Sequence, residues 1–232
     1  MASLLDQVQR GPTPRPRRAM VYGVHGVGKS TFASMADAPI FIQTEEGLDD
    51  IDCAKFPLAK SYKEVIDALG VLYKEKHQFH TVAIDSLDWL EQLIHAEVCK
   101  KYPHYDKKEI TSIEDFGFGK GYVLAQTWWR HVLSGLDALR SDRGMSVILL
   151  AHAKIEKFTD PNAETYDRYA PALNKNGSAI LQQWCDEVLF AGYVVYTREM
   201  DEGNKKKRAI GTGSGERVLR TSERPAWIAK NR

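Results

Sequence analysis

The eight residues Gly23–Ser30, which read Gly-Val-His-Gly-Val-Gly-Lys-Ser, limit what this chain can fold into more than any other segment. They match the pattern G-x-x-x-x-G-K-[ST] at every position. An apolar run, Ala19–Tyr22, precedes them, and residues 29–36 suit a helix. Glycines in such a loop let backbone N–H groups curl around phosphate oxygens at the start of a helix. The segment therefore predicts a buried strand, a phosphate-binding loop and a helix, in that order.

The residue types in and after this loop predict ATP and Mg²⁺ as cofactors. Lys29 is expected to reach the β- and γ-phosphates, Ser30 to bind Mg²⁺ through its hydroxyl, and Thr31 to contact the α-phosphate. The expected nucleotide-binding residues are Gly23, His25, Gly26, Val27, Gly28, Lys29, Ser30 and Thr31.

Apolar segments that read as strands alternate along the chain with patterns of helical period. Strands are expected at Ile40–Thr44, Thr81–Asp85 and Ser146–Leu150. Helices are expected after a capping-box pattern at 61–64 and over residues 87–101, 122–139 and 178–185. Strands that alternate with helices form a parallel sheet covered on both faces. The predicted fold class is α/β, a mostly parallel sheet flanked by helices.

The two ends of the chain differ from this alternating middle. Residues 1–18 include a Pro-rich stretch and are expected to form an extended N-terminal arm. Residues 19–232 are expected to form one domain. From about residue 186 onward, strand-like stretches separated by glycines predict an antiparallel C-terminal extension. Residues 102–121 and 155–176 show no clear periodicity and are expected to be loops.

Composition narrows the class of protein. Cys53, Cys99 and Cys185 lie far apart with no CxxC spacing, so neither a disulfide framework nor a zinc site is expected. No apolar run approaches the roughly 20 residues that span a bilayer, so we expect a cytoplasmic protein with no membrane partner.

The net charge of +1 excludes a uniformly basic binder of polyanions, but the charge is unevenly distributed. Residues 1–20 hold four arginines and one acid, and residues 198–232 hold ten basic and five acidic residues. The segment between them is therefore acidic overall. Basic ends around an acidic body suit either an anionic polymer or a neighbouring subunit.

Acidic residues follow two of the expected strands. Asp85 ends an apolar strand and is expected to hold Mg²⁺ in its second shell or through water. Ser86 follows it, so the glutamate that often activates water at that place is missing. Glu45 and Glu46 instead follow the second strand, whose carboxyl end opens onto the phosphate crevice in a parallel sheet. A carboxylate there can polarise an attacking water.

The segment Phe41–Asp49 resembles the RecA-like recombination ATPases, whose second strand ends in a similar Phe-Ile-x-x-Glu-x-x-Leu-Asp pattern. This resemblance implies that Glu45 is the catalytic glutamate, with Glu46 as the alternative. It also places His152 where the family has a polar residue, often Gln, that senses the γ-phosphate and relays its state to a DNA-binding loop.

The tail Trp227–Arg232 is similar to the Ala-Lys-x-Arg element of RecA-fold hexameric helicases. In those proteins the lysine and the arginine reach into the nucleotide of the neighbouring subunit, where cations stabilise developing phosphoryl charge. The similarity implies the same roles for Lys230 and Arg232, and a homo-oligomer with nucleotide at its subunit interfaces.

From about Met20 to Arg232 the chain resembles the small RecA-like ATPases of bacteriophages linked to single-strand annealing and recombination. That resemblance implies a RecA-like P-loop core, Mg²⁺-dependent and DNA-stimulated ATP hydrolysis, and single-stranded DNA as a partner. A single-strand-binding protein is a further candidate partner. Three segments combine basic with aromatic residues or are densely basic, and are the candidate DNA contacts: Tyr102–Gly121, Ile155–Asn176 and Lys205–Arg208.

Two other functions fit the same sequence. One is a helicase-like motor or a loader that acts on another protein. The other is a nucleotide-gated binding module with little hydrolysis. The sequence leaves open whether the nucleic acid is DNA or RNA and whether the assembly is a ring or a filament. It also leaves open whether the protein anneals, exchanges or unwinds strands.

Overall fold

The computed structural model describes residues 4–161, 163–201 and 207–231, with side chains described outside 197–211. Its centre is an eight-stranded sheet in the order β12-β9-β1-β7-β4-β2-β3, with β8 joined to β7. The strands are β1 (Arg18–Gly23), β2 (Pro39–Gln43), β3 (Ala54–Lys55), β4 (Thr81–Asp85), β7 (Ser146–Phe158), β8 (Tyr166–Pro171), β9 (Glu187–Tyr193) and β12 (Arg217–Arg220). The core strands β9, β1, β7, β4, β2 and β3 run parallel, and β8 and β12 are antiparallel. The predicted α/β fold class is confirmed.

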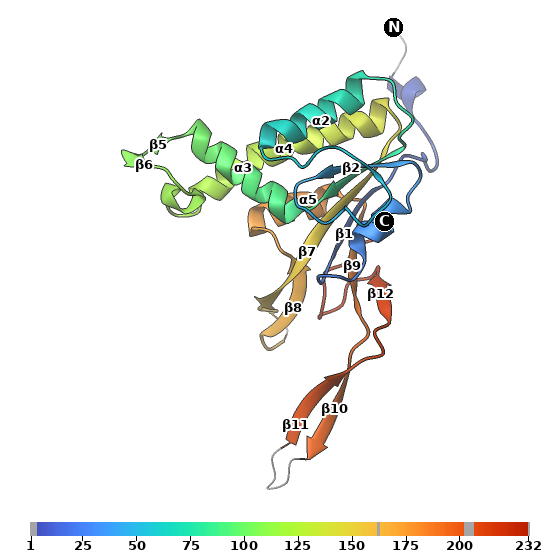
Figure 1. Ribbon diagram of the computed structural model, residues 1–232, viewed down its shortest axis with the longest axis vertical. Coiled ribbons are helices and arrows are strands. Elements are labelled where there is room, and N and C mark those ends of the chain that lie inside the picture. The colour runs from blue at the N-terminus through green and yellow to red at the C-terminus, as the bar shows by residue number, and fades with distance from the viewer. Residues whose placement is uncertain (1–3, 162, 202–206, 232) are drawn as a thin grey trace.

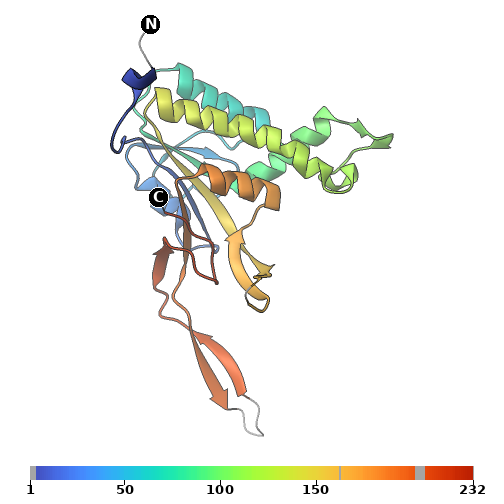
Figure 2. The ribbon, with the colours of Figure 1, turned by 180° about the vertical axis from the view of Figure 1, so that it is seen from behind.

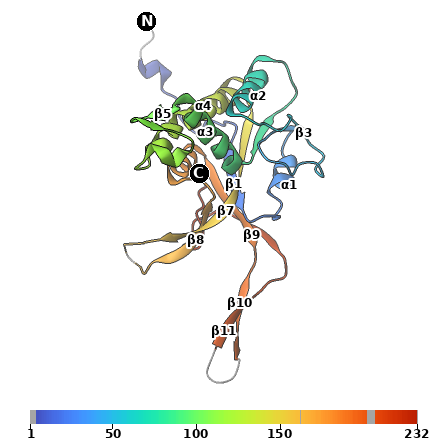
Figure 3. The same ribbon diagram turned by 60° about the vertical axis from the view of Figure 1, so that its left-hand side comes forward.

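The sheet is covered on its two faces by layers of unequal thickness. One face packs its apolar residues against four helices: α2 (Tyr62–Lys74), α3 (Leu87–Lys101), α4 (Lys120–Asp142) and α5 (Lys175–Trp184). The other packs against the short α1 (Lys29–Ser34) and the loop around Leu48 (Figures 1 and 3). All five residues of β4 are buried, as a strand covered on both faces requires.

The helix boundaries follow the sequence signals. At the start of α2 the backbone N–H of Glu64 donates to the hydroxyl of Ser61, the residue before the helix, while the Glu64 carboxylate accepts from that hydroxyl and from the N–H of Lys60. Two short 3₁₀ helices, Leu4–Gln7 and Ile113–Phe116, lie outside the sheet layers. No helix of the described residues is both long and apolar enough to cross a membrane.

Two sequence expectations about strands were wrong. Residues 155–176 were expected to form a loop, but β7 continues to Phe158 and pairs antiparallel with β8 from Ala153 to Pro171. We call residues 153–171 the β7–β8 arm. An exposed two-stranded ribbon buries neither face fully, so it lacks the apolar run by which a core strand is recognised; Ile155 in this arm is 63% exposed. The second error is that β9 pairs parallel with β1, so the core sheet ends later than expected.

The antiparallel part of the tail consists of β12 and a hairpin formed by β10 (Tyr196–Asp201) and β11 (Lys207–Thr212). We call residues 196–212 the β10–β11 arm. It projects from the same end of the molecule as the β7–β8 arm (Figures 1 and 2). Of the basic run predicted to contact DNA, residues 205–206 lie outside the described residues, and Lys207 begins β11.

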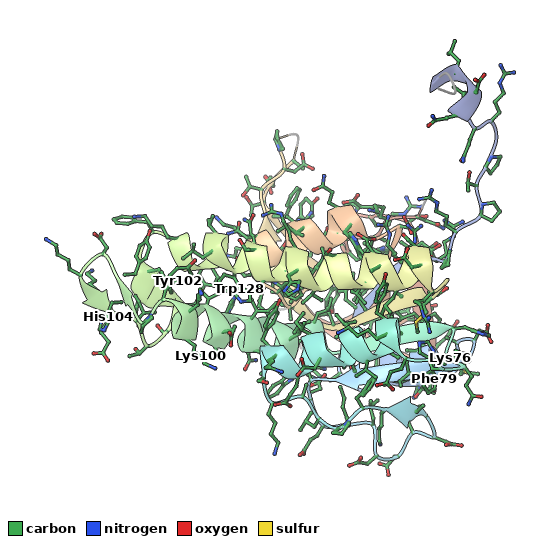
Figure 4. The ribbon with its side chains drawn as sticks, turned by 90° about the horizontal axis from the view of Figure 1, so that it is seen from above. Lys76, Phe79, Lys100, Tyr102, His104 and Trp128 are labelled. Carbon is green, nitrogen blue, oxygen red and sulfur yellow. The ribbon has the colours of Figure 1, made fainter. Side chains whose placement is uncertain are left out.

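The segment 102–121 was expected to be a loop, and most of it is irregular. It holds a small hairpin of β5 (His104–Tyr105) and β6 (Lys108–Glu109). Figure 4 places Tyr102 and His104 at one end of the helical layer and Lys76 and Phe79 at the other. This segment therefore projects in a different direction from the two arms (Figure 1).

Helix α3 fastens the base of the β7–β8 arm. The backbone N–H of Asn174, just beyond β8, donates to Oε2 of Glu91 at 2.8 Å. The Nζ of Lys154 on β7 donates to the carbonyl of Leu173 at 2.6 Å. Glu91 is 7% exposed, and burial raises its pKa to about 7, although the Asn174 N–H and the charge of Lys154 act to lower it. A buried acid therefore ties the arm to the helical layer.

The first glycine of the phosphate-binding loop is a packing requirement. A Cβ at Gly23 would lie 2.2 Å from the carbonyl oxygen of Ala191 on β9, whereas a Cβ at Gly70 in α2 would meet nothing within 4 Å. We expect Gly23→Ala to lower the free energy of unfolding by about 1–3 kcal/mol or more through this overlap. Gly70→Ala should raise it by about 0.5–1 kcal/mol, because alanine suits a helix interior better. Chemical denaturation measures both, and equal effects would contradict the packing argument.

Glu91 also predicts how stability depends on pH. Its pKa in the folded chain is about 7, above the ordinary 4.5, so folding retains a proton that the unfolded chain releases. The free energy of unfolding should therefore fall as pH rises from 4.5 to 7. Glu91→Gln should remove this contribution and be more stable than the parent above pH 7, by on the order of 1–3 kcal/mol. Glu97→Gln, on the same helix, is the control, and parallel profiles for the parent and Glu91→Gln would contradict the assignment.

Candidate active site

The phosphate-binding loop runs from the end of β1 to the start of α1. Gly26 and Gly28 have φ angles of 69° and 97°, in the region that favours glycine. Lys29 is 7% exposed, and its Nζ donates to the carbonyl oxygens of Gly23 and Val24 at 3.2 Å each. Burial lowers the pKa of Lys29, while the charges of Asp85 and Glu45 act in the opposite direction. The ammonium group thus sits within the loop, among carboxylates.

A hydroxyl and a carboxylate meet next to this lysine. The Oγ of Ser30 donates to Oδ2 of Asp85 at 2.6 Å. Asp85 is 5% exposed, and burial raises its pKa, although Ser30 and Lys29 act to lower it. No cluster of three or more His, Cys, Asp or Glu side chains suited to a metal occurs in the described parts of the chain. Magnesium is usually held by one or two protein oxygens together with phosphates and water, so the Ser30–Asp85 pair fits Mg²⁺ bound with a nucleotide.

The ends of β2 and β4 are tied together, which sets Glu45 relative to Asp85. The N–H of Thr44 donates to the carbonyl of Asp85 at 2.7 Å, and its Oγ1 donates to the carbonyl of Ser86 at 2.6 Å. The N–H of Ser86 donates back to Oγ1 of Thr44 at 2.9 Å. Glu45 directly follows Thr44 in the chain, and burial raises the pKa of its carboxyl group. These bonds hold the candidate catalytic glutamate at the same edge of the sheet as Asp85.

His152 on β7 completes the polar edge. Its Nδ1 lies 2.8 Å from Oδ2 of Asp88 and 3.8 Å from Oε1 of Glu45, and its backbone N–H donates to Oδ1 of Asp88 at 3.0 Å. Its ring stacks on His25 of the loop, with centroids 4.1 Å apart. The bond to Asp88 raises the pKa of His152, and burial acts to lower it. Burial acts to raise the pKa of Asp88, but the bonds from His152 outweigh it and lower that pKa.

One cavity of about 390 Å³ brings most of the predicted residues together. Its lining comprises His25, Gly26, Gly28, Lys29, Ser30, Thr31, Glu45, Glu46, Gly47, Leu48, Ile51, Asp85 and His152. Two residues predicted to bind nucleotide are absent from this lining. Val27 is 5% exposed and packs in the apolar core beneath the loop, and Gly23 packs against Ala191.

Of the two cations predicted in the tail, the structure describes Lys230 but not Arg232. Lys230 pairs through its backbone with Val188, and its Nζ donates to the carbonyl of Gln182 at 2.6 Å. It does not line the cavity of its own chain. Arg232 lies outside the described residues. Action of either cation on a neighbouring subunit stays a prediction.

Two charged residues at the site were missed by sequence reasoning. Asp88 lies in the first turn of α3, three residues after Asp85 at the end of β4, and this closeness in the sequence was the available signal. Arg217 on β12 places its Nη1 only 3.1 Å from where a Cβ at Gly28 would stand. No local pattern marked Arg217, because its position depends on β12 folding back antiparallel to β9.

The candidate DNA-contacting segments expose aromatic and basic groups. Phe118 is fully exposed and has a φ of 47°, between Gly117 and Gly119, whose φ angles are also positive. The neighbouring Lys120 lies 5.7 Å over the ring of Tyr105. In the β7–β8 arm, the guanidinium of Arg168 lies 3.8 Å over the ring of Phe158 and pairs with Glu156 at 3.1 Å.

Comparisons with known proteins give a family. A family model described as an AAA domain matches residues 15–232. No curated protein matches the chain. Among solved structures, the crystal structure of the RadB recombinase is similar, with 16% sequence identity and a TM-score of 0.46, over 94% of this chain and 91% of that one. Because the family model spans nearly the whole chain and includes the phosphate-binding loop, the protein belongs to the AAA domain family of P-loop ATPases.

Proposed function

We propose that the protein binds ATP with Mg²⁺ and hydrolyses it. The observation that carries this proposal is the single cavity that Lys29, Ser30, Glu45 and Asp85 line together. The backbone of the loop and the Nζ of Lys29 hold the phosphates, and Ser30 with Asp85 holds the cation. Mg²⁺, when bound, neutralises charge that develops on the phosphate oxygens.

Hydrolysis then proceeds by in-line attack of water on the γ-phosphorus. Glu45 orients that water and takes its proton while the new P–O bond forms. The bond from the γ-phosphorus to the bridging oxygen breaks, and ADP leaves with that oxygen. Lys29 stabilises the charge shared between the leaving oxygen and the γ-phosphate. The ties from Thr44 to Asp85 and Ser86 keep Glu45 in position.

We propose His152 as the residue that senses the γ-phosphate. Its ring lies between Asp88, Glu45 and His25 at the cavity, and its carbonyl accepts from the N–H of Ala172 at 2.7 Å, beside the last pair of the β7–β8 arm. A change at the phosphate site can therefore reach the base of the arm through one residue.

Paired substitutions at the two adjacent glutamates test the catalytic assignment. Glu45→Gln should lower the turnover number of ATP by about 10²–10⁴-fold, because the general base is lost. Its affinity for a fluorescent ATP analogue should change little, since Lys29 and the loop remain. Glu46→Gln, which also lines the cavity, is the matched control and should keep most of the activity. The reverse ranking of the two variants would move the catalytic role to Glu46.

We propose further that the protein acts on single-stranded DNA as a homo-oligomer, in phage recombination, annealing or replication. Two features support the DNA partner: the pair of β-hairpin arms at one end of the sheet, and the exposed Phe118, two residues before Lys120. In the oligomer, Lys230 and Arg232 complete the nucleotide site of a neighbour. A single-strand-binding protein is proposed as a further partner.

Measurement of ATP turnover with and without single-stranded DNA tests this proposal. Turnover should rise with DNA and should fall again as salt screens the phosphate contacts. Phe118→Ala should weaken DNA binding by about five- to hundredfold, the usual value of one base stacked on an aromatic ring. Tyr73→Ala, an exposed aromatic on α2, should not. DNA-independent turnover without salt-sensitive binding would exclude the DNA function.

A nucleotide-gated binding module is the second candidate. Glu45 and Asp88 both contact His152, so the binding of a nucleotide can change the conformation at His152 without being followed by hydrolysis. Such a module would show negligible turnover that Glu45→Gln does not change. A helicase-like motor would separate the strands of a forked duplex, which an annealing factor would not do.

A further inference from the structure

A second cavity, of about 230 Å³, lies outside the nucleotide site, where the two arms leave the sheet. Segments that are far apart in the sequence contribute to it: the loop at Val24, the end of β8, the end of β9 with the connection to β10, β12 and the tail. Its lining is Val24, Tyr169, Phe190, Gly192, Tyr193, Val195, Arg220, Ala226 and Trp227. The lining includes Tyr169 of the β7–β8 arm and Val195, which directly precedes the β10–β11 arm.

Three aromatic rings form one layered wall of this cavity. Tyr169 stacks on Phe190 with centroids 4.8 Å apart at 23°, and Phe190 stacks on Trp227 at 6.2 Å and 19°. The wall is fixed by hydrogen bonds. The Nε1 of Trp227 donates to the carbonyl of Ser222 at 3.0 Å, and the N–H of Tyr169 donates to the carbonyl of Ala226 at 2.9 Å. The rings are therefore held in place before any ligand arrives, which lowers the cost of binding one.

The rim of the cavity adds a cation and exposed apolar surface. The guanidinium of Arg220 lies 4.1 Å over the ring of Trp227, and no ion pair of Arg220 with a carboxylate occurs among the described side chains. Tyr193 and Val195 are 37% and 65% exposed. Flat rings next to an arginine suit a ligand that is itself flat and carries negative charge close by.

The cavity also touches the phosphate-binding loop. The hydroxyl of Tyr193 donates to the carbonyl of Gly26 at 3.1 Å, and Val24 is part of the lining. An occupant would therefore lie where the two arms begin, in contact with the loop that is proposed to hold the nucleotide.

We propose that this cavity receives an unstacked nucleobase of a single strand that runs between the two arms. The base stacks on the aromatic wall, and Arg220 contacts the adjoining phosphate. This inference rests on the proposed single-strand function for its polymer. It adds the place of one base, in a cavity whose lining residue Tyr193 is hydrogen-bonded to Gly26 of the nucleotide loop.

Photocrosslinking tests the place of the base. The full chain is irradiated with oligothymidylate that carries 5-iodouracil, and crosslinked peptides are identified by mass spectrometry. Crosslinks to Tyr193, Tyr169 or Trp227 are expected. Crosslinks confined to the segment 102–121 or to the arm tips would overturn the inference while leaving single-strand binding intact. If free thymidine monophosphate prevents these crosslinks as effectively as unlabelled oligothymidylate does, the cavity binds a mononucleotide and the strand assignment is overturned.

Affinities for an oligothymidylate and for an abasic oligomer of the same length provide the second readout. The parent should prefer the oligomer with bases, and Tyr193→Ala should lose about five- to hundredfold of that preference. Val195→Asp, at an exposed position of the rim, should have the same effect, whereas Tyr73→Ala should have none. Equal affinity of the parent for both oligomers would overturn the base pocket alone, and no affinity for either would overturn the DNA function as well.

Tyr193→Phe separates the ring from the hydroxyl. It should keep the affinity for oligothymidylate, but ATP should change that affinity less than it does in the parent. If the Tyr193 variants alter the oligomeric state at unchanged DNA affinity, the cavity takes a side chain of a second copy and the nucleobase is excluded.

Discussion

The position of β1 between β7 and β9 is the constraint on which the rest of this structure depends. Gly23, the last residue of β1, pairs with His152 on one side and with Ala191 on the other. The contact with Ala191 leaves no room for a side chain, so the strand can pass into the loop at this place only with glycine. The same register sets His152 beside the loop, where it meets His25 and Glu45. The pairing of β1 with both neighbours thus fixes the loop and the residue proposed to sense its ligand.

Burial, as well as the number of neighbouring charges, affects which side chains around the loop favour their charged forms. Glu45, Asp85 and Asp88 face Lys29 and His152 at one edge of the sheet. Burial favours the neutral forms of Glu45 and Asp85, whereas the close bond to His152 keeps Asp88 charged. Asp88 and His152 are therefore bonded so that each favours the charged form of the other. Glu45 and Asp85 are the carboxylates whose charge an incoming cation and a water would favour, which agrees with the roles proposed for them.

Local signals explain what could be predicted from the sequence. The loop, Glu45, Asp85 and His152 were predicted because parallel strands gather their carboxyl ends at one edge. Lys29, Ser30, Glu45, Asp85 and His152 do line one cavity, although β7 continues beyond His152 to Phe158. The side chain of Val27 packs in the core instead of lining the cavity, and binding of phosphate by its backbone N–H stays a prediction. Arg217 and the parallel pairing of β9 depend on how the tail folds back, and the β7–β8 arm has no buried face, so no period in the sequence marked any of them.

Each arm follows a residue that contacts the phosphate-binding loop. These contacts connect the proposed nucleotide site to the proposed DNA-binding arms. The β7–β8 arm follows His152, whose ring stacks on His25, and Glu91 ties its other strand to α3 through Asn174. The β10–β11 arm follows Tyr193, whose hydroxyl bonds to Gly26. His25 and Gly26 are adjacent in the loop, so under the proposed function a change in the geometry of the loop would act on the bases of both arms together. Because linkage is reciprocal, a strand held between the arms would in turn act on the affinity for nucleotide.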